Sequence, residues 1–207
     1  MATLLLCLAG PMQSWGHDSK FERRTTGREP TKSGVVGLLA AALGRGREED
    51  ISDLAALKFG VRVEQSGQLL RDYHTAASKK NSYVTERYYL TDAKFIVGFE
   101  GDKEFLQAIE SAVKSPVYPL FLGRRSCPPA GRICLGIKDL PLVQALGTFG
   151  AGAIIDADSP TAIRRRDLPR SFSQAYRKHD FRYITEIGTN HDAFDSGLEE
   201  LDDTVAN

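Results

Sequence analysis

The 207-residue sequence lacks several features by which common classes of protein are recognised. It has no excess of charge, because 27 Lys and Arg residues balance 27 Asp and Glu residues, so no overall field draws it to a polyanion or a membrane. Its three cysteines, Cys7, Cys127 and Cys134, are an odd number without a Cys-x-x-Cys spacing. This pattern excludes a disulfide framework and a cysteine zinc site, and it indicates reduced cytoplasmic thiols.

Long hydrophobic runs and common catalytic motifs are also missing. The longest apolar run near the start, Leu4 to Ala9, is too short to cross a bilayer and follows no basic segment. We therefore expect no membrane span, no secretory signal and a cytoplasmic protein. No His-Glu-x-x-His, Gly-x-Ser-x-Gly or paired metal-ligand spacing occurs, so we predict neither a metal nor a cofactor.

The apolar residues that are present, 42% of the chain, suffice for one large domain or a domain with a small appendage. Ser33 is the expected N-cap of the first helix, and Gly44 its end. The segment 69–75 is expected to return along 60–64 as an extra hairpin. The hydrophobic pattern predicts strands over 3–9, 60–64, 69–75, 95–99 and 117–122, and helices over 34–43, 48–57 and 102–114.

Apart from the extra hairpin, this order of elements resembles the βαββαβ unit of ferredoxin-like α+β folds. The polar, basic segment 76–81 indicates a protruding hairpin or loop. Beyond Gly131 the pattern weakens, and residues 153–156 and 182–187 predict strands of a smaller C-terminal sheet. The acidic residues from Asp192 onward predict a frayed tail.

The first candidate site is the polar loop 12–32, which contains Gln13 and Ser14 near its start. Loops of this length are uncommon in compact domains unless they are functional or disordered. Trp15 could stack on a base. Lys32 and Ser33 would place charge, a hydroxyl and backbone N–H groups at a helix start, like half of a phosphate cradle, although Walker spacing is absent. A solvated loop before an ordinary capped helix is the alternative. Phosphates could be held by Lys20, Arg23, Arg24, Arg28 and Lys32.

The second candidate combines His74 with the tyrosines and arginine of the segment 83–89. A histidine beside Tyr73, Arg87 and Tyr88 could serve acid–base chemistry on a ribose 2′-hydroxyl. The same residues could instead stack on bases and hold phosphates. A single histidine is more often a hydrogen-bonded structural residue, so catalysis is the less favoured interpretation.

The third candidate is the segment Gly123 to Pro129, where two arginines follow a glycine. Arg124 and Arg125 could fork onto a phosphate, and we expect their removal to leave the fold intact. The alternative is a rigid Pro-Pro turn flanked by surface charge. Cys127, after Ser126, has no recognisable base and is not predicted to be a nucleophile.

The fourth candidate is the segment 164–182, which holds seven basic and two acidic residues. Aromatic residues lie among these charges: Phe172, Tyr176, Phe181 and Tyr183. Basic residues mixed with aromatics are typical of proteins that bind single-stranded nucleic acid. A solvated basic face is the alternative, but clustering within a neutral protein favours RNA.

Several of these motifs together resemble the CasD family, subunits of type I-E CRISPR Cascade that belong to the RAMP superfamily and hold the 5′ handle of the crRNA. The resemblance runs from about residue 3 to 187. It is carried, in order, by Leu8 to Gly16, Pro30 to Gly44, Leu70 to Thr75, Thr85 to Ala93, Pro119 to Pro129 and Arg166 to Pro169.

The resemblance implies a ferredoxin-like, RRM-like domain over 1–130, a thumb hairpin at about 76–93, a small C-terminal β region over 131–190 and a disordered tail over 191–207. It also implies an RNA-binding role in antiviral defence, with no homo-oligomer. The partners would be the crRNA, the CasC backbone subunit at the thumb, the large CasA subunit nearby, and CasE and the small subunit in the same complex. Assigned by chemistry, the RNA contacts would be Gln13, Ser14, Trp15, Arg24, Lys32, Ser33, His74, Arg87, Tyr88, Arg124, Arg125, Ser126 and Cys127.

An enzyme is the alternative, because a sibling branch of the superfamily cleaves precursor crRNA with a Tyr/Lys/His-type set. Here only His74, with Tyr73 or Tyr88 and a lysine at 79 or 80, could form one. CasE resembles the dedicated processing nuclease, so we expect a non-catalytic subunit and keep a metal-independent endoribonuclease as the alternative. The neutral charge predicts weak RNA binding alone and tight binding in an assembly.

Overall fold

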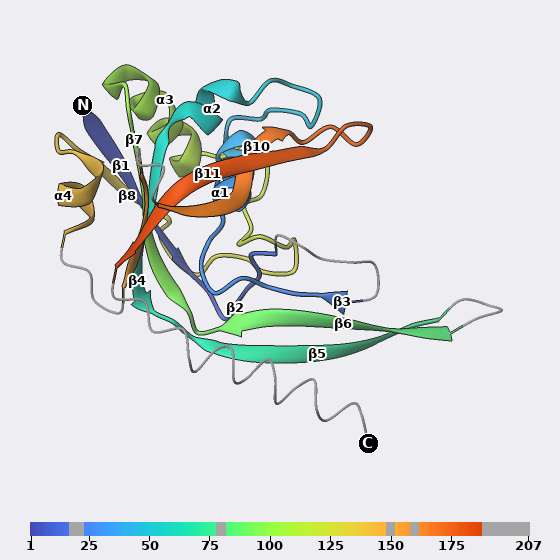
Figure 1. Ribbon diagram of the computed structural model, residues 1–207. Helices are drawn as coiled ribbons and strands as arrows, with labels where there is room; N and C mark the ends of the chain where they lie inside the picture. Colours follow the sequence, from blue (N-terminus) through green and yellow to red (C-terminus); the bar gives the residue numbers. More distant parts are fainter. Residues whose placement is uncertain (17–22, 78–81, 148–151, 158–161, 188–207) are drawn as a thin grey trace.

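The structure is a computed structural model, which describes residues 1–16, 23–77, 82–147, 152–157 and 162–187 (Figure 1). The chain forms a mixed α/β structure with largely antiparallel sheets and few helices. The helices are α1 (Lys32–Ala42), α2 (Ser52–Ala56), α3 (Lys103–Lys114) and α4 (Leu142–Leu146). The strands are β1 (Ala2–Ala9), β2 (Met12–Gln13), β3 (Arg23–Arg24), β4 (Lys58–Gln65), β5 (Gln68–Ala77), β6 (Ser82–Thr91), β7 (Lys94–Gly101), β8 (Cys134–Lys138), β9 (Ala153–Asp156), β10 (Ile163–Ser171) and β11 (Lys178–Ile187).

The central sheet has seven strands in the order β10-β11-β9-β4-β7-β1-β8. Its strands β4, β7, β1 and β8 are neighbours in antiparallel pairs. The helices α1 and α2 connect β1 to β4, and α3 connects β7 to β8. None of the helices in the described ranges is long and apolar enough to span a membrane.

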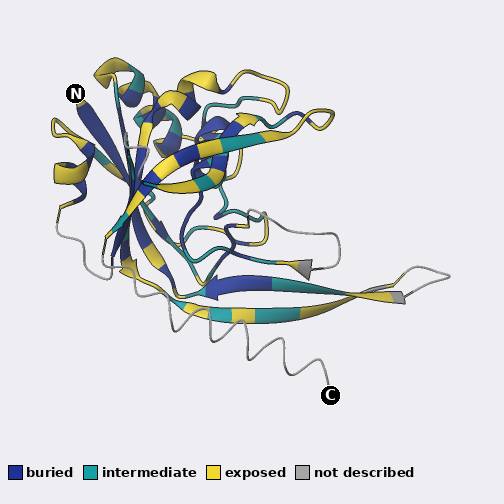
Figure 2. Ribbon diagram, viewed as in Figure 1, coloured by how far each residue is buried: buried dark blue, intermediate teal, exposed yellow. Residues whose placement is uncertain are grey.

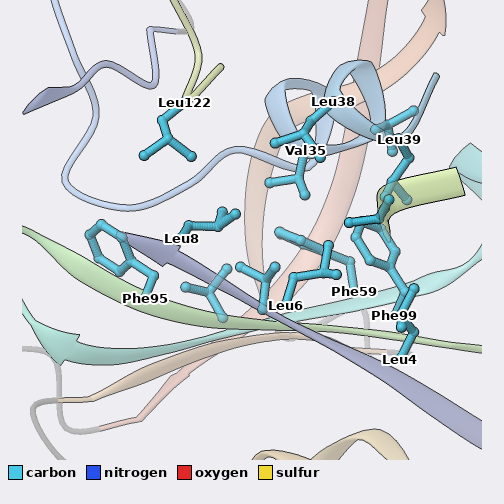
Figure 3. Packing of buried hydrophobic residues seen from close by; sticks show 14 of the residues in the cluster. Leu4, Leu6, Leu8, Val35, Leu38, Leu39, Phe59, Phe95, Phe99 and Leu122 are labelled. Atoms are coloured by element: carbon cyan, nitrogen blue, oxygen red, sulfur yellow. The ribbon is translucent and has the colours of Figure 1, made fainter. Parts of the chain in front are cut away.

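The core lies on both faces of β1, which explains why this strand is a continuous apolar run. On one face Leu4, Leu6 and Leu8 are fully buried against Phe59 and Phe95 beneath α1 and α3 (Figure 3). Each such leucine contributes about 1.5–3 kcal/mol by leaving water. On the other face a smaller cluster packs under α4, and it contains Leu5, Ile96, Leu142, Leu146, Ala153 and Ile155.

The first helix forms where the sequence predicted it, but its cap is Thr31 instead of Ser33. Thr31 is extended, and its hydroxyl accepts a hydrogen bond from Gly34 N at 3.2 Å. Ser33 already lies inside the helix. After α1 the chain turns at Gly44, whose φ of +77° lies in the left-handed region that glycine adopts easily.

Helix α3 confirms the prediction from amphipathic spacing. Asp102 caps it by accepting a hydrogen bond from Phe105 N at 3.1 Å. Its expected inner face is buried at Leu106, Ile109 and Val113, with Ala112 half-buried. The spacing of apolar residues therefore suffices to predict both the helix and its buried face where a helix packs on a sheet.

The strand expected at 117–122 does not form, and β8 takes its place beside β1. The physical reason is the end of α1, whose last carbonyls need donors. Val117 N donates to Ala42 O at 3.0 Å, and Tyr118 N donates to Ala41 O at 3.2 Å. The segment therefore closes the helix instead of pairing with a strand.

The projecting hairpin is longer than predicted and pairs differently. Strand β5 does not return along β4; it pairs with β6 from Gln68 opposite Thr91 to Ala77 opposite Ser82. At Gly67 the chain passes so close to β6 that a Cβ would lie 2.4 Å from Thr91 O, which directs β5 out of the central sheet. The hairpin projects from the body, and its exposure rises away from the base (Figures 1 and 2).

The strands predicted at 153–156 and 182–187 form as β9 and β11, but they do not make a separate sheet. Strand β9 pairs with β4, with Val61 opposite Ile154, so β9, β11 and β10 extend the central sheet. A boundary at residue 130 would also separate β8 from β1, its partner. The predicted acidic tail, 191–207, lies outside the described residues.

Candidate nucleic-acid interface

Four of the arginines singled out from the sequence lie on segments that meet midway along the hairpin of β5 and β6. Arg24 on β3 lies opposite Arg87 on β6. Arg124, far away in the sequence, donates hydrogen bonds to the carbonyl oxygens of Arg24 at 2.7 Å and Tyr88 at 3.2 Å. Arg125 follows directly and is exposed, as is Arg24. The fold thus gathers four positive charges from three distant segments.

Within this arginine cluster (Arg24, Arg87, Arg124, Arg125) the members have different roles. Arg124 is half-buried, also donates to Thr25 O at 3.3 Å, and lies over the ring of Tyr89 at 4.8 Å. It holds the three segments together, so its removal is expected to affect the fold more than removal of a loop charge would. Arg24 and Arg125 are the members free to meet an anion in solvent.

Arg87 has a side-chain donor that no acceptor among the described residues satisfies. Its Nε is buried and has no hydrogen-bond partner in the described part of the chain. A buried donor without a partner costs about 1–3 kcal/mol, so such groups are rare unless a ligand or water completes them. A phosphate oxygen would be a suitable acceptor, because arginine binds phosphate with several donors at once.

The loop that contains Arg124 and Arg125 is held close to the N-terminal segment. Ser14 N donates to Leu122 O at 3.1 Å. Gly123 has a φ of +84°, and a Cβ there would lie 1.8 Å from Ser14 O. Only glycine permits this approach, and the approach places the arginine loop against the hairpin.

Gln13, Ser14 and Trp15 were predicted to contact RNA, but protein encloses them. Their exposed fractions are 0%, 2% and 1%. Gln13 Nε2 donates to Leu8 O at 3.1 Å and Ala93 O at 2.7 Å, while its Oε1 accepts from Trp15 Nε1 at 3.0 Å. Ser14 Oγ donates to Tyr88 O at 3.1 Å. These side chains fix the loop, and their contact with RNA stays a prediction.

The predicted phosphate cradle at Lys32 and Ser33 is filled by carboxylates of the chain itself. Lys32 Nζ pairs with Asp156 Oδ2 at 3.0 Å, and Lys32 N donates to Asp167 Oδ2 at 2.9 Å. Burial lowers the pKa of Lys32, against the opposing effect of Asp156. The anion at the start of α1 is therefore Asp167, and contact of Lys32 with RNA stays a prediction. Ser33 is half-buried.

The residues proposed for acid–base chemistry are not brought together. His74 Nε2 lies 2.6 Å from Asp72 Oδ2, and its side chain is half exposed. Tyr73 is its neighbour on β5, so the two side chains lie on opposite faces. Tyr88 is fully buried, and its contact with RNA stays a prediction. The lysines at 79 and 80 lie outside the described residues.

Cys127 and Ser126 close the turn of the arginine loop. Cys127 N donates to Arg124 O at 2.9 Å, and Cys127 O accepts from Leu122 N at 2.7 Å. Cys127 is fully buried, and burial raises the pKa of its thiol. Its contact with RNA stays a prediction. Ser126 is exposed. Within the described ranges, no group of His, Cys, Asp and Glu side chains is arranged to hold a metal ion.

Sequence reasoning missed two features that organise the site. The carbonyls of Thr25 and Tyr88 bind Arg124, and backbone acceptors have no signature in residue types. The ring of Tyr89 under the guanidinium was also missed. The tyrosine-rich segment did contain a signal for it, since arginines commonly stack on aromatic faces.

Comparisons with known proteins agree on one family. The model of the CRISPR-associated protein family (Cas_Cas5) matches residues 3–185. The CRISPR system Cascade subunit CasD of Escherichia coli (strain K12) is 40% identical, covering 64% of this chain and 70% of that protein. A crystal structure of a Cas protein has 41% identity and a TM-score of 0.72, covering 89% of this chain and 93% of its own. A chain of a CRISPR RNA-guided surveillance complex has 31% identity and a TM-score of 0.77, covering 90% of each.

The chain therefore belongs to the CRISPR-associated Cas5 family, because the family match spans most of its length. The resemblance to CasD that the motifs carried is confirmed by the similarity to the Escherichia coli Cascade subunit.

Proposed function

We propose that this chain is the CasD subunit of a type I-E Cascade surveillance complex, where it holds the 5′ handle of the crRNA in antiviral defence. The observation that carries the proposal is the arginine cluster beside the middle of the projecting hairpin, in a member of this family. In a chain without net charge, such a cluster is a local site for phosphates.

The handle would lie along the exposed members of the cluster. Arg24 and Arg125 can each fork onto a phosphate, and Ser126 adds an exposed hydroxyl beside them. The unpartnered Nε of Arg87 would gain an acceptor when a phosphate enters. Arg124 would act as a positioning residue, because its donors already bind three carbonyl groups.

The hairpin of β5 and β6 would act as the thumb that contacts a CasC backbone subunit. Along its length it carries apolar and aromatic side chains that a monomer leaves in water: Leu70, Tyr73, Tyr83 and Val84. An edge of this length and apolarity is a surface that a protein partner would cover. The CasA subunit would lie nearby, with CasE and the small subunit in the same cytoplasmic complex.

The ferredoxin-like, RRM-like arrangement is part of this proposal. The order β4-β7-β1-β8, with helices between β1 and β4 and between β7 and β8, supports it. Because β8 belongs to that sheet, the domain would extend to about residue 138, past the expected boundary at 130. The C-terminal β region would then be strands β9 to β11.

A non-catalytic role is also proposed. Metal-free cleavage needs a base for the 2′-hydroxyl and an acid for the leaving oxygen, both within reach of one bound phosphodiester. His74 and Tyr73 lie on opposite faces of β5, and the carboxylate of Asp72 is already paired with His74. This arrangement favours a structural interaction for the histidine.

The test uses the assembled complex with labelled crRNA carrying the intact handle. The double variant Arg24→Ala/Arg125→Ala should shed the crRNA at lower salt than the wild type, because two phosphate contacts are lost. Arg47→Ala/Arg132→Ala removes two exposed arginines elsewhere and should behave like the wild type. Equal salt resistance of all three complexes would refute this site.

In a separate sample, the isolated chain with EDTA present should leave labelled precursor RNA intact on a denaturing gel. A discrete cut that disappears in His74→Ala would establish an endoribonuclease instead. Deleting residues 75–84 and closing β5 to β6 with a two-residue Asn-Gly turn should prevent assembly with CasC while leaving a folded monomer. Undiminished assembly would refute the thumb.

A further inference from the structure

The hairpin of β10 and β11 has an outward face with unusual side chains for a solvent-exposed sheet. Arg182 and Ile184 of β11 are buried on its inner face, so Phe181 and Tyr183 point outward. Each of these two rings is 43% exposed. Arg164 lies opposite Tyr183 in the pairing and shares its face.

The arginines of this face are arranged around the rings. The guanidinium carbon of Arg164 lies 3.8 Å from the centre of the Phe181 ring, and that of Arg166 lies 6.0 Å from it. A guanidinium stacked on a ring keeps its N–H donors in its own plane, where a phosphate can reach them. Its flat outer surface is one on which a base can stack.

The charge of the hairpin is not compensated. Its acids are each paired with an arginine: Asp167 with Arg182, Asp180 with Arg170 and Glu186 with Arg165. Four other basic residues lie in the same described strands and their connection, with no ion pair found for them in the described part of the chain: Arg164, Arg166, Arg177 and Lys178.

We propose that this outward face (Arg164, Arg166, Phe181, Tyr183) binds single-stranded RNA, as a second contact separate from the arginine cluster. Two residues along a strand are about 6.6 Å apart. This is about twice the 3.4 Å rise of a stacked strand in a duplex, so each ring suits one base of an extended strand. Stacking rings beside arginines are the combination that single strands need.

The occupant is RNA because the proposed function places the chain in an RNA-guided complex, so this choice rests on that function. The binding itself would not require the repeat sequence, because rings and arginines recognise base faces and phosphates without reading base edges. A protein partner fits less well, since nothing apolar on the face is enclosed enough to form a pocket for its side chains.

The first measurement is fluorescence anisotropy of the full chain with a labelled oligouridine of about 12 nucleotides, which contains no repeat sequence. Phe181→Ala and Tyr183→Ala should each weaken binding on the order of tenfold. Phe181→Leu keeps an apolar side chain but removes the flat ring on which a base stacks, so it should weaken binding of the oligouridine by a similar factor. The control Tyr118→Ala removes an exposed ring elsewhere and should change nothing.

The salt dependence separates charge from stacking. Arg164→Gln/Arg166→Gln should reduce the slope of log affinity against log salt by about 1.4, or 0.7 for each phosphate contact. Arg47→Gln/Arg132→Gln should leave the slope unchanged. Unaltered binding in the ring variants would overturn the proposal, and so would a stronger affinity for an oligothymidine DNA of equal length.

The outcome is distinguishable from that of the proposed function. The ring variants should leave retention of the crRNA handle by the arginine cluster unchanged in the complex. If Arg24→Ala/Arg125→Ala fails to release the handle while the ring variants lose oligouridine, the proposed handle site is wrong and this face stands. The reverse result refutes this face alone.

Discussion

Arg182 holds Asp167 by two hydrogen bonds inside the protein, with Nε 2.5 Å from Oδ1 and Nη2 2.9 Å from Oδ2. The side chains are 6% and 0% exposed. Arg182 also pairs with Asp156, which in turn binds Lys32 at the start of α1. This buried network joins the first helix to all three C-terminal strands, although more than a hundred residues separate them.

Breaking the network should destabilise the whole protein. Arg182→Met keeps the length of the side chain but leaves the carboxylates of Asp156 and Asp167 without their guanidinium partner. Loss of one partner from a buried pair costs about 3–5 kcal/mol, which urea unfolding followed by circular dichroism would measure. Arg170→Met removes an exposed pair with Asp180 and is the matched control. Equal urea midpoints of unfolding for Arg182→Met and Arg170→Met would contradict a structural role for Arg182.

The same pair predicts a dependence of stability on pH. Burial alone would raise the pKa of Asp167, but the hydrogen bonds and charge of Arg182 outweigh it and hold the pKa below its usual value. The unfolded chain therefore takes up the proton first as pH falls, and the stabilisation disappears below the usual value of about 3.9. The wild type should have a larger free energy of unfolding than Asp167→Asn. This difference should be constant from pH 7 to about 5 and should shrink below about pH 4. A difference that persists unchanged to the lowest pH with folded protein would contradict this assignment.

The parts of the fold that were predictable are those encoded in short windows. The apolar run of β1 and the spacing of Leu106, Ile109 and Val113 in α3 specify their own burial. The pairing of β5 with β6 was not predictable in this way, because both possible neighbours of β5 present a similar pattern. Close approach at Gly67 decides between them, and that is a tertiary contact.

In the candidate site, the sequence predicts which residue types can bind RNA but not which of those side chains the fold buries. Residue type suggested Arg24, Arg87 and Arg125 as candidate ligands for phosphate, and the fold pairs Arg24 with Arg87 across β3 and β6. Residue type alone could not distinguish these arginines from Trp15 and Lys32. An indole ring and an ammonium group can also bind RNA, but the fold buries both side chains. Their partners, Gln13 and Asp156, include a carboxylate 124 positions away in the sequence.

Gly123 should tolerate no side chain. Gly123→Ala would place a Cβ 1.8 Å from Ser14 O, and it would also hold alanine at a φ of +84°. The left-handed conformation alone costs about 1–2 kcal/mol, and the clash adds a displacement of the arginine loop. Thermal unfolding should show a markedly lower Tm, and the salt resistance of the crRNA complex should fall with it.

Gly131→Ala is the matched control for that substitution. Its φ of +76° is nearly the same, but nothing lies within 4 Å of the added Cβ. It should therefore show only the conformational cost, with crRNA retention unchanged. If the two alanine variants lose the same stability, close packing against Ser14 is not what requires Gly123.

Arg124 and Arg125 are adjacent in sequence but should respond to substitution in opposite ways. Arg124→Ala leaves the carbonyls of Arg24, Thr25 and Tyr88 without their shared donor, each loss costing about 0.5–1.5 kcal/mol. Arg125→Ala removes an exposed charge and should change the free energy of unfolding by less than about 0.5 kcal/mol.

Binding should separate the two residues as well. Arg125→Ala should lower the salt slope of crRNA binding without lowering Tm, because it removes a phosphate contact and nothing else. Arg124→Lys restores the charge without the planar fork, so it should stay destabilised in urea if carbonyl binding is the role of Arg124. Full recovery of stability in Arg124→Lys would show that an ammonium group binds these carbonyls as well as the guanidinium does, and that the planar fork is not what this position requires.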